Sequence, residues 1–367
     1  MRKPTLALIA SLLLAGLALA RPAVAQAPDH PSGVAVAPPV EMPSPQEYPD
    51  PVGEKLMELE NYGEAAEHYR GALKKDPDNA PACAGLGAAL CQGGKPKEAL
   101  EELGKCIKKM PGKSGLYAAR GLCFFLGGEN FSAQAEDDYK KALELDPKNA
   151  VARNELGLLF QRMGRHDLAI PEFQAAIAAD PDLFVAYNNL GASLIATRRF
   201  DEAIKVLQQG IARKPPHKGF FLYQNLGIAF LYAGKLPQAE AAFLLEIALN
   251  PEHLDGYVNL GNIYLITGRY DDAVFEFYRV LVSDPDNRQA LINIGIAYVK
   301  SGNAMNGGRY LKKAVELYPD SALAHHYLGL AYQSLGDQDR AAEEQAKAKK
   351  QGYNPDASTW PLKPPGP

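Results

Sequence analysis

The sequence predicts an all-α fold, a solenoid of about nine helical hairpins, and three regularities of spacing predict it. Prolines recur at steps of 34 or 36 residues from Pro77 to Pro355. A glycine lies ten residues after most of these prolines, and a small residue lies twelve residues after most of those glycines. A fixed period of this length is typical of repeat arrays, in which each repeat buries its apolar face against its neighbours.

The segment before the array is predicted to be a secretory signal peptide, residues 1–25. Two basic residues open it, an uncharged apolar run follows from Leu6 to Ala20, and Ala23-Val24-Ala25 supplies a small-x-small cleavage pattern. The apolar run is short for a membrane-spanning helix, which needs about 20 residues. We therefore expect cleavage before Gln26 and an exported mature protein, periplasmic or extracellular, without a membrane span. Retention of the segment as an anchor is the alternative.

Residues 26–50 carry seven prolines and are predicted to form an extended linker, because proline interrupts both helices and sheet ladders. At the other end of the chain, residues 356–367 form a short tail after the last unit.

Each unit between these ends is predicted to hold two amphipathic helices. A second glycine, seven residues after the first, turns the chain between them. Asp-Pro or Asn-Pro ends the second helix, and the Asn or Asp that follows, such as Asn149, is a good N-cap for the next unit. The units are predicted near residues 46–79, 80–113, 114–149, 150–183, 184–219, 220–253, 254–287, 288–321 and 322–355.

This pattern resembles the tetratricopeptide repeat (TPR), a 34-residue helix-turn-helix unit, over residues 46–355. The resemblance implies a right-handed superhelix whose first helices line a concave groove. Departures from the repeat pattern are few. Glu246 replaces a small residue in a second helix, and Cys83, Arg153 and His325 replace the usual aromatic at the fourth position.

An asparagine ladder is the strongest candidate site. The sixth position of four consecutive units, which faces the groove in TPR arrays, holds Asn189, Asn225, Asn259 and Asn293. Asparagine is a poor helix former, so helix stability does not explain the column. A side-chain amide donates and accepts hydrogen bonds and can pair with an extended peptide backbone. The column is similar to the asparagine ladder in the repeat domain of O-linked N-acetylglucosamine transferase. Further groove candidates are Asn188, Gln224, Asp255, Asn262 and Gln289. The alternative is that Asn at this position reflects the repeat consensus alone.

The four cysteines, Cys83, Cys91, Cys106 and Cys123, fall in two adjacent units. An oxidising compartment permits one or two disulfides, and three connectivities are open. The alternative is that they are buried small apolar residues. Their spacing contains no Cys-x-x-Cys, so a zinc site is not expected.

Composition and motifs exclude several function classes. A net charge of −4 and a pI near 6.0 argue against a nucleic-acid partner. The sequence holds no catalytic motif and no metal-binding motif, so we expect neither an enzyme nor a cofactor. The leading hypothesis is a scaffold that binds an extended segment of a partner protein in its groove. The alternative is a structural subunit of an envelope assembly (secretion, pilus or polysaccharide export) that makes contacts through its convex face or its ends. Self-association stays open.

Overall fold

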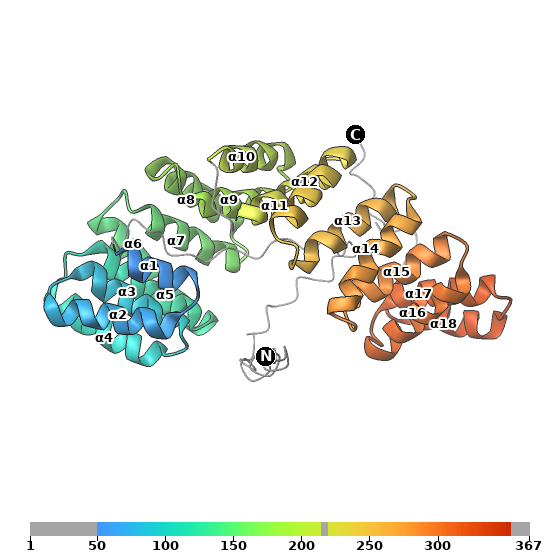
Figure 1. Ribbon diagram of the computed structural model, residues 1–367, viewed down its shortest axis with the longest axis horizontal. Coiled ribbons are helices and arrows are strands. Elements are labelled where there is room, and N and C mark those ends of the chain that lie inside the picture. The colour runs from blue at the N-terminus through green and yellow to red at the C-terminus, as the bar shows by residue number, and fades with distance from the viewer. Residues whose placement is uncertain (1–49, 214–218, 354–367) are drawn as a thin grey trace, which may run out of the picture. The chain divides into compact units, whose positions relative to one another are not determined.

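A computed structural model describes residues 50–213 and 219–353. The predicted signal peptide, nearly all of the proline-rich linker and the C-terminal tail lie outside these ranges. Within them the chain forms 18 α-helices, one short 3-10 helix and no strand (Figure 1). The predicted all-α fold is confirmed.

The helices alternate along the chain as the first and second members of nine hairpins. They are α1 (Pro51–Glu58) and α2 (Tyr62–Lys75), α3 (Ala80–Gln92) and α4 (Pro96–Lys109), α5 (Ser114–Leu126) and α6 (Ser132–Leu145) with the 3-10 helix η2 (Glu129–Phe131) between them, α7 (Ala150–Arg162) and α8 (His166–Ala179), α9 (Phe184–Ala196) and α10 (Phe200–Ala212), α11 (Phe220–Tyr232) and α12 (Leu236–Leu249), α13 (Leu254–Ile266) and α14 (Tyr270–Ser283), α15 (Arg288–Lys300) and α16 (Ala304–Leu317), and α17 (Ala322–Ser334) and α18 (Gln338–Lys350).

Short polar residues begin several of the first helices. The Asn149 side-chain Oδ1 accepts a hydrogen bond of 2.8 Å from the backbone N–H of Ala152. Asn79, Asn287 and Ser321 cap α3, α15 and α17 in the same way. Each of these bonds satisfies a backbone donor that the first helical turn leaves without a partner.

A left-handed residue makes the turn inside each hairpin. Gly268 has a φ of +77°, and the equivalent glycines of six other units also have positive φ. In the fifth unit this position is held by Arg198, with a φ of +61°. A residue with a side chain pays about 1–2 kcal/mol for this left-handed conformation. The fifth hairpin therefore keeps the same turn geometry although arginine disfavours it.

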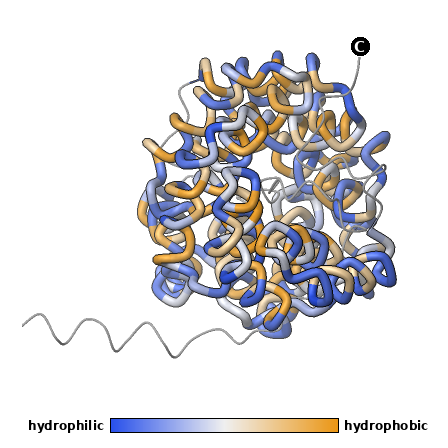
Figure 2. Tube along the Cα trace, turned by 90° about the vertical axis from the view of Figure 1, so that its right-hand side faces the viewer, coloured by the Kyte–Doolittle hydropathy of each residue, from blue (hydrophilic) through white to orange (hydrophobic). Residues whose placement is uncertain are grey.

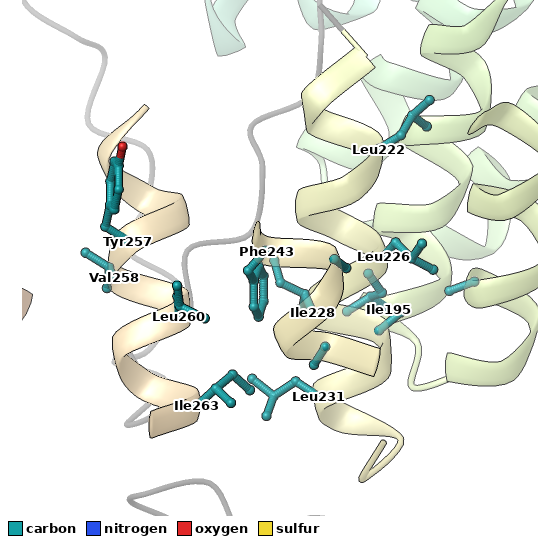
Figure 3. Close-up of a cluster of buried hydrophobic side chains, with 14 of the residues drawn as sticks. Ile195, Leu222, Leu226, Ile228, Leu231, Phe243, Tyr257, Val258, Leu260 and Ile263 are labelled. Carbon is teal, nitrogen blue, oxygen red and sulfur yellow. The ribbon is translucent and has the colours of Figure 1, made fainter. Parts of the chain in front are cut away.

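The regular spacing of glycines from one unit to the next is explained by packing. The glycine near the middle of each first helix receives a large side chain from the second helix of the same unit. A Cβ on Gly261 would lie 2.6 Å from Cε1 of Phe277, and one on Gly227 would lie 2.5 Å from Cε1 of Phe243. Phe243 is fully buried and points from α12 toward Leu260 of α13 and Ile228 of α11 (Figure 3).

Neighbouring units are joined mainly by the packing of each second helix against the first helix of the next unit, for example α10 against α11 and α14 against α15. From α3 to α11 each first helix contacts the next, and so do α13, α15 and α17, whereas consecutive second helices contact each other little. The first helices therefore form the closely packed side of the stack. From α3 onward, α11 and α13 are the neighbouring first helices with the least direct contact. There Leu231 of α11 and Ile263 of α13 point toward each other (Figure 3).

Along the helices, hydrophobic and hydrophilic residues alternate (Figure 2). The larger of the buried apolar clusters extends through most of the repeats, and a second cluster is centred on α3. This continuous core is what the repeat period predicts, because no single hairpin can bury its own apolar face.

Two disulfides cross-link the second cluster. Cys83 of α3 pairs with Cys106 of α4, with their Cα atoms 6.6 Å apart. Cys91 of α3 pairs with Cys123 of α5, with a Cα–Cα distance of 5.5 Å. Both distances lie in the ordinary range for disulfides. The first bond closes a hairpin, and the second joins two consecutive units.

Candidate functional site

The four asparagines of the ladder lie on consecutive first helices, α9, α11, α13 and α15. Their exposed fractions are 0% for Asn189, Asn225 and Asn259 and 3% for Asn293. This differs from the expectation that the amides face water in an open groove. The 34-residue period predicts which side of the helix each amide occupies, but it does not predict how closely the neighbouring helices approach.

Part of the row is a chain of hydrogen bonds between units. Asn225 Nδ2 donates to Asn188 Oδ1 at 2.9 Å, and Asn189 Nδ2 donates to Asn154 Oδ1 at 3.1 Å. Within units the chain continues, since Asn188 Nδ2 lies 3.4 Å from Asn189 Oδ1 and Asn154 Nδ2 donates to Glu155 Oε1 at 3.1 Å. These amides thus connect α11, α9 and α7.

Sequence analysis missed Asn154 and Glu155, which extend the chain of hydrogen bonds into the unit before the ladder. They occupy the fifth and sixth positions of the unit that begins at residue 150. The signal was present, because Asn154, Asn188 and Gln224 place an amide at the fifth position of three consecutive units. Gln224 is also fully buried.

The other part of the row has unused hydrogen-bonding capacity. Asn293 Nδ2 donates to Asn262 Oδ1 at 2.8 Å. In the part of the chain that the structure describes, Asn259 has no hydrogen-bond partner at Nδ2 or at Oδ1. Asn262 Nδ2 and Asn225 Oδ1 likewise have none there. A buried polar group without a hydrogen bond costs about 1–3 kcal/mol, so α13 holds an unsatisfied polar site.

The remaining groove candidates, Asp255 and Gln289, are half-buried near the starts of α13 and α15. Asp255 lies close to a pair of ionisable side chains at the junction of the sixth and seventh units, the buried Glu246 and the half-buried His253. His253 Nδ1 is 3.0 Å from Glu246 Oε1, and His253 Nε2 is 3.8 Å from Asp255 Oδ2. Burial raises the pKa of the Glu246 carboxyl, and the hydrogen bond to Glu246 raises the pKa of the His253 imidazole.

Glu246 occupies a position that holds a smaller residue in other units. It fits there because the neighbouring residue, Gly256, has no side chain. A Cβ on Gly256 would lie 3.2 Å from Oε1 of Glu246, so the absence of a side chain there makes room for the carboxylate. Other units hold an alanine at the same place, for example Ala290 and Ala324.

No group of three or more His, Cys, Asp or Glu side chains in residues 50–213 and 219–353 is placed to hold a metal ion. In the same ranges, no helix has both the length and the apolar character needed to cross a membrane.

Comparison with known proteins identifies the repeat. Models described as tetratricopeptide repeat match residues 56–121, 126–184, 154–218, 225–288, 289–321 and 310–343. This chain belongs to the tetratricopeptide-repeat family. The helix pairs of the TPR array lie within these matches over most of their length.

Curated relatives match short parts of the TPR array. Hsp70-Hsp90 organizing protein 3 of Arabidopsis thaliana is 30% identical over 112 residues, which is 28% of this chain and 20% of the relative. Tetratricopeptide repeat protein 16 of Homo sapiens is 39% identical over 72 residues, 20% of this chain and 8% of that protein. The matched part is thus a fifth or less of the length of these two relatives.

Solved structures share the fold over longer stretches. A chain of the Cut9–Hcn1 complex of APC/C superposes with a TM-score of 0.59 at 19% identity, covering 76% of this chain and 54% of that chain. PilW, a type IV pilus biogenesis factor, superposes with a TM-score of 0.53 at 22% identity, covering 57% of this chain and 96% of PilW. These likenesses establish the TPR solenoid fold.

Proposed function

We propose that this TPR protein is a non-catalytic scaffold that binds an extended segment of a partner protein along its row of amides. The observation that carries the proposal is Asn259, a fully buried side chain whose amide has no partner at either atom within the described ranges. A bound segment that supplies these hydrogen bonds would remove the cost of leaving them unmade.

The chemistry of Asn259 favours main-chain recognition. A side-chain amide holds a donor and an acceptor side by side, and so does one residue of an extended backbone. Contacts to the main chain give affinity without requiring a particular side chain. The weak contact between α11 and α13 is the place where a segment could reach the amide with the least loss of packing.

The test separates binding from stability by substituting two asparagines. Peptides selected from a random library on the wild-type protein serve as probes. Asn259→Ala removes two expected hydrogen bonds, so we expect affinity to fall roughly 5- to 150-fold, from about 0.5–1.5 kcal/mol per bond. The free energy of unfolding should stay the same or rise, because Ala is the better helix former and no observed bond is lost.

Asn225→Ala is the matched control, since it breaks the 2.9 Å bond to Asn188 and should lower stability. Methylation of individual backbone nitrogens of the peptide provides a second arm. Methylation of the one backbone nitrogen that pairs with Asn259 should weaken binding of the peptide to the wild-type protein. The same methylation should not weaken binding to the Asn259→Ala variant any further. If a folded Asn259→Ala variant binds the peptides with wild-type affinity, the proposal is wrong, and the outer face or the ends of the array become the candidate binding sites.

We also propose that the protein is exported. The support is the basic, apolar and small-x-small pattern of residues 1–25. We expect the intact mass of the protein recovered from outside the cytoplasm to correspond to a chain that begins at Gln26. A mass that includes residues 1–25 would instead indicate a retained anchor.

A further inference from the structure

The outward side of α12 is unusual for a second helix because it carries no exposed charge. Of its two charged residues, Glu246 is buried and Glu240 is half-buried and bonded to Arg269. Leu244, Leu245 and Leu249 are 47%, 49% and 48% exposed. The other exposed residues of the helix are uncharged, namely Pro237, Gln238, Ala241 and Ala248.

The next second helix, α14, continues the apolar surface. Phe275, Tyr278 and Val282 are 61%, 55% and 67% exposed. Their spacing of three and four residues places them on one side of the helix. Adjacent repeats present equivalent positions in the same direction, so the stripes of α12 and α14 lie on one side of the stack.

The repeat itself does not require apolar residues at these positions. Leu244 and Tyr278 occupy the 25th position of their units, where the preceding units hold Gln174 and Gln208 and the following unit holds Lys312. Gln174, Gln208 and Lys312 are all exposed. The apolar surface is therefore a local property of the sixth and seventh units, and a contiguous surface of this kind marks an interaction site.

We propose that this surface, the outward sides of α12 and α14, pairs with the same surface of a second copy of the chain in a two-fold dimer. A two-fold interface sets a surface against itself. An uncharged face such as that of α12 can pack on its own copy without bringing like charges together. A partner of opposite charge would find no charge on α12 to recognise.

The charges of α14 also suit pairing with a copy. Asp271, Phe275 and Arg279 follow one another at intervals of four residues, so they lie along one side of the helix. When two α14 helices cross antiparallel with Phe275 near the axis, Asp271 of each copy lies opposite Arg279 of the other. Asp271 is exposed. The Arg279 side chain is 45% exposed beside Glu276 and donates a hydrogen bond of 3.0 Å to the hydroxyl of Tyr257, so Asp271 of the other copy would be a further partner for this guanidinium.

The size of the surface matches a stable dimer. A standard interface buries roughly 800 Å² on each partner. Six large apolar side chains that are each about half exposed, with three small residues on α12 beside them, supply most of that area. This inference goes beyond the proposed function and does not depend on it, because the amide row lies on the first helices.

The test is sedimentation equilibrium of the chain without its predicted signal peptide, residues 26–367, over a range of concentrations. We expect a monomer–dimer equilibrium in the wild type. Leu244→Glu combined with Tyr278→Glu places two charges on the apolar surface, one on each helix, and should raise the dimer dissociation constant more than about a hundredfold. The matched control, Gln208→Glu with Lys312→Glu, changes the same repeat position in the flanking units and should leave the constant unchanged. Asn259→Ala should also leave it unchanged.

A charge exchange tests the antiparallel geometry. Asp271→Arg alone should weaken the dimer, and Asp271→Arg combined with Arg279→Asp should restore it. Circular dichroism establishes that each variant is folded. A wild-type protein that stays monomeric at all concentrations would overturn the proposal. So would a monomer that binds lipid vesicles through Leu244 and Tyr278. A dimer that survives the Leu244→Glu and Tyr278→Glu changes would overturn it as well.

Discussion

Replacing Cys91 and Cys123 together with alanine is expected to lower the stability of the second and third units by about 2–4 kcal/mol. The disulfide joins α3 to α5 across 32 residues of chain, and its loss returns that loop entropy to the unfolded state. Each repeat contacts only its neighbours and long arrays do not unfold in a single step, so the loss of stability should be confined to the second and third units. Hydrogen exchange of the amides of α3 and α5 should speed up, while exchange in α15 should not change.

Reduction of the wild-type protein provides the control for this effect. A thiol reductant should reproduce the faster exchange of α3 and α5 without any substitution. The double alanine variant should then show no further response in α5. Equal exchange in the oxidised and reduced proteins would contradict a stabilising role for the bond.

The second large effect is expected from Gly261→Leu. A Cβ at this position would already lie 2.6 Å from Phe277, which is fully buried and cannot move into solvent. The remaining atoms of leucine would force α13 and α14 apart, and overpacking of this kind costs about 1–3 kcal/mol. Thermal unfolding followed by circular dichroism should show a lower midpoint.

Gly308 of α16 provides a matched glycine for this experiment. A Cβ there would meet only Ala331 Cβ, at an ordinary 3.7 Å. Gly308→Ala should therefore keep or raise the midpoint, because alanine is the better helix former. If Gly261→Leu unfolds at the wild-type temperature, the close packing of α13 on α14 does not limit the size of this residue.

Much of the fold could be predicted from the sequence because the signals at helix ends are local. The Asp146-Pro147-Lys148-Asn149 segment contains both the end of α6 and the cap of α7, and the structure has both. Turn glycines such as Gly268 are equally local, since their positive φ depends on one residue.

The candidate site was less predictable because it depends on distances between units. The period places Asn189 and Asn225 in one column, yet Asn225 bonds to Asn188 rather than to Asn189. That choice follows from how far each helix shifts against the next.

The disulfide pairing shows the same limit. Cys83 and Cys91 are eight residues apart on α3, which separates their directions by about 80° around the helix. They therefore point toward different neighbours, one toward α4 and the other toward α5. The sequence spacing shows that they diverge, but only the packed units show which neighbour each one meets.

The two disulfides overlap along the chain, since Cys91 lies between Cys83 and Cys106, and Cys106 lies between Cys91 and Cys123. A force applied to the two ends of the protein would therefore pass directly from Cys91 to Cys123. The chain between these two cysteines, which are separated by 32 positions, would be excluded from extension. This shortens the fully stretched chain by roughly 110 Å at about 3.5 Å per residue. Under tension the array would lengthen by unfolding of the other repeats, while the second and third units would stay covalently linked and act as a mechanical clamp.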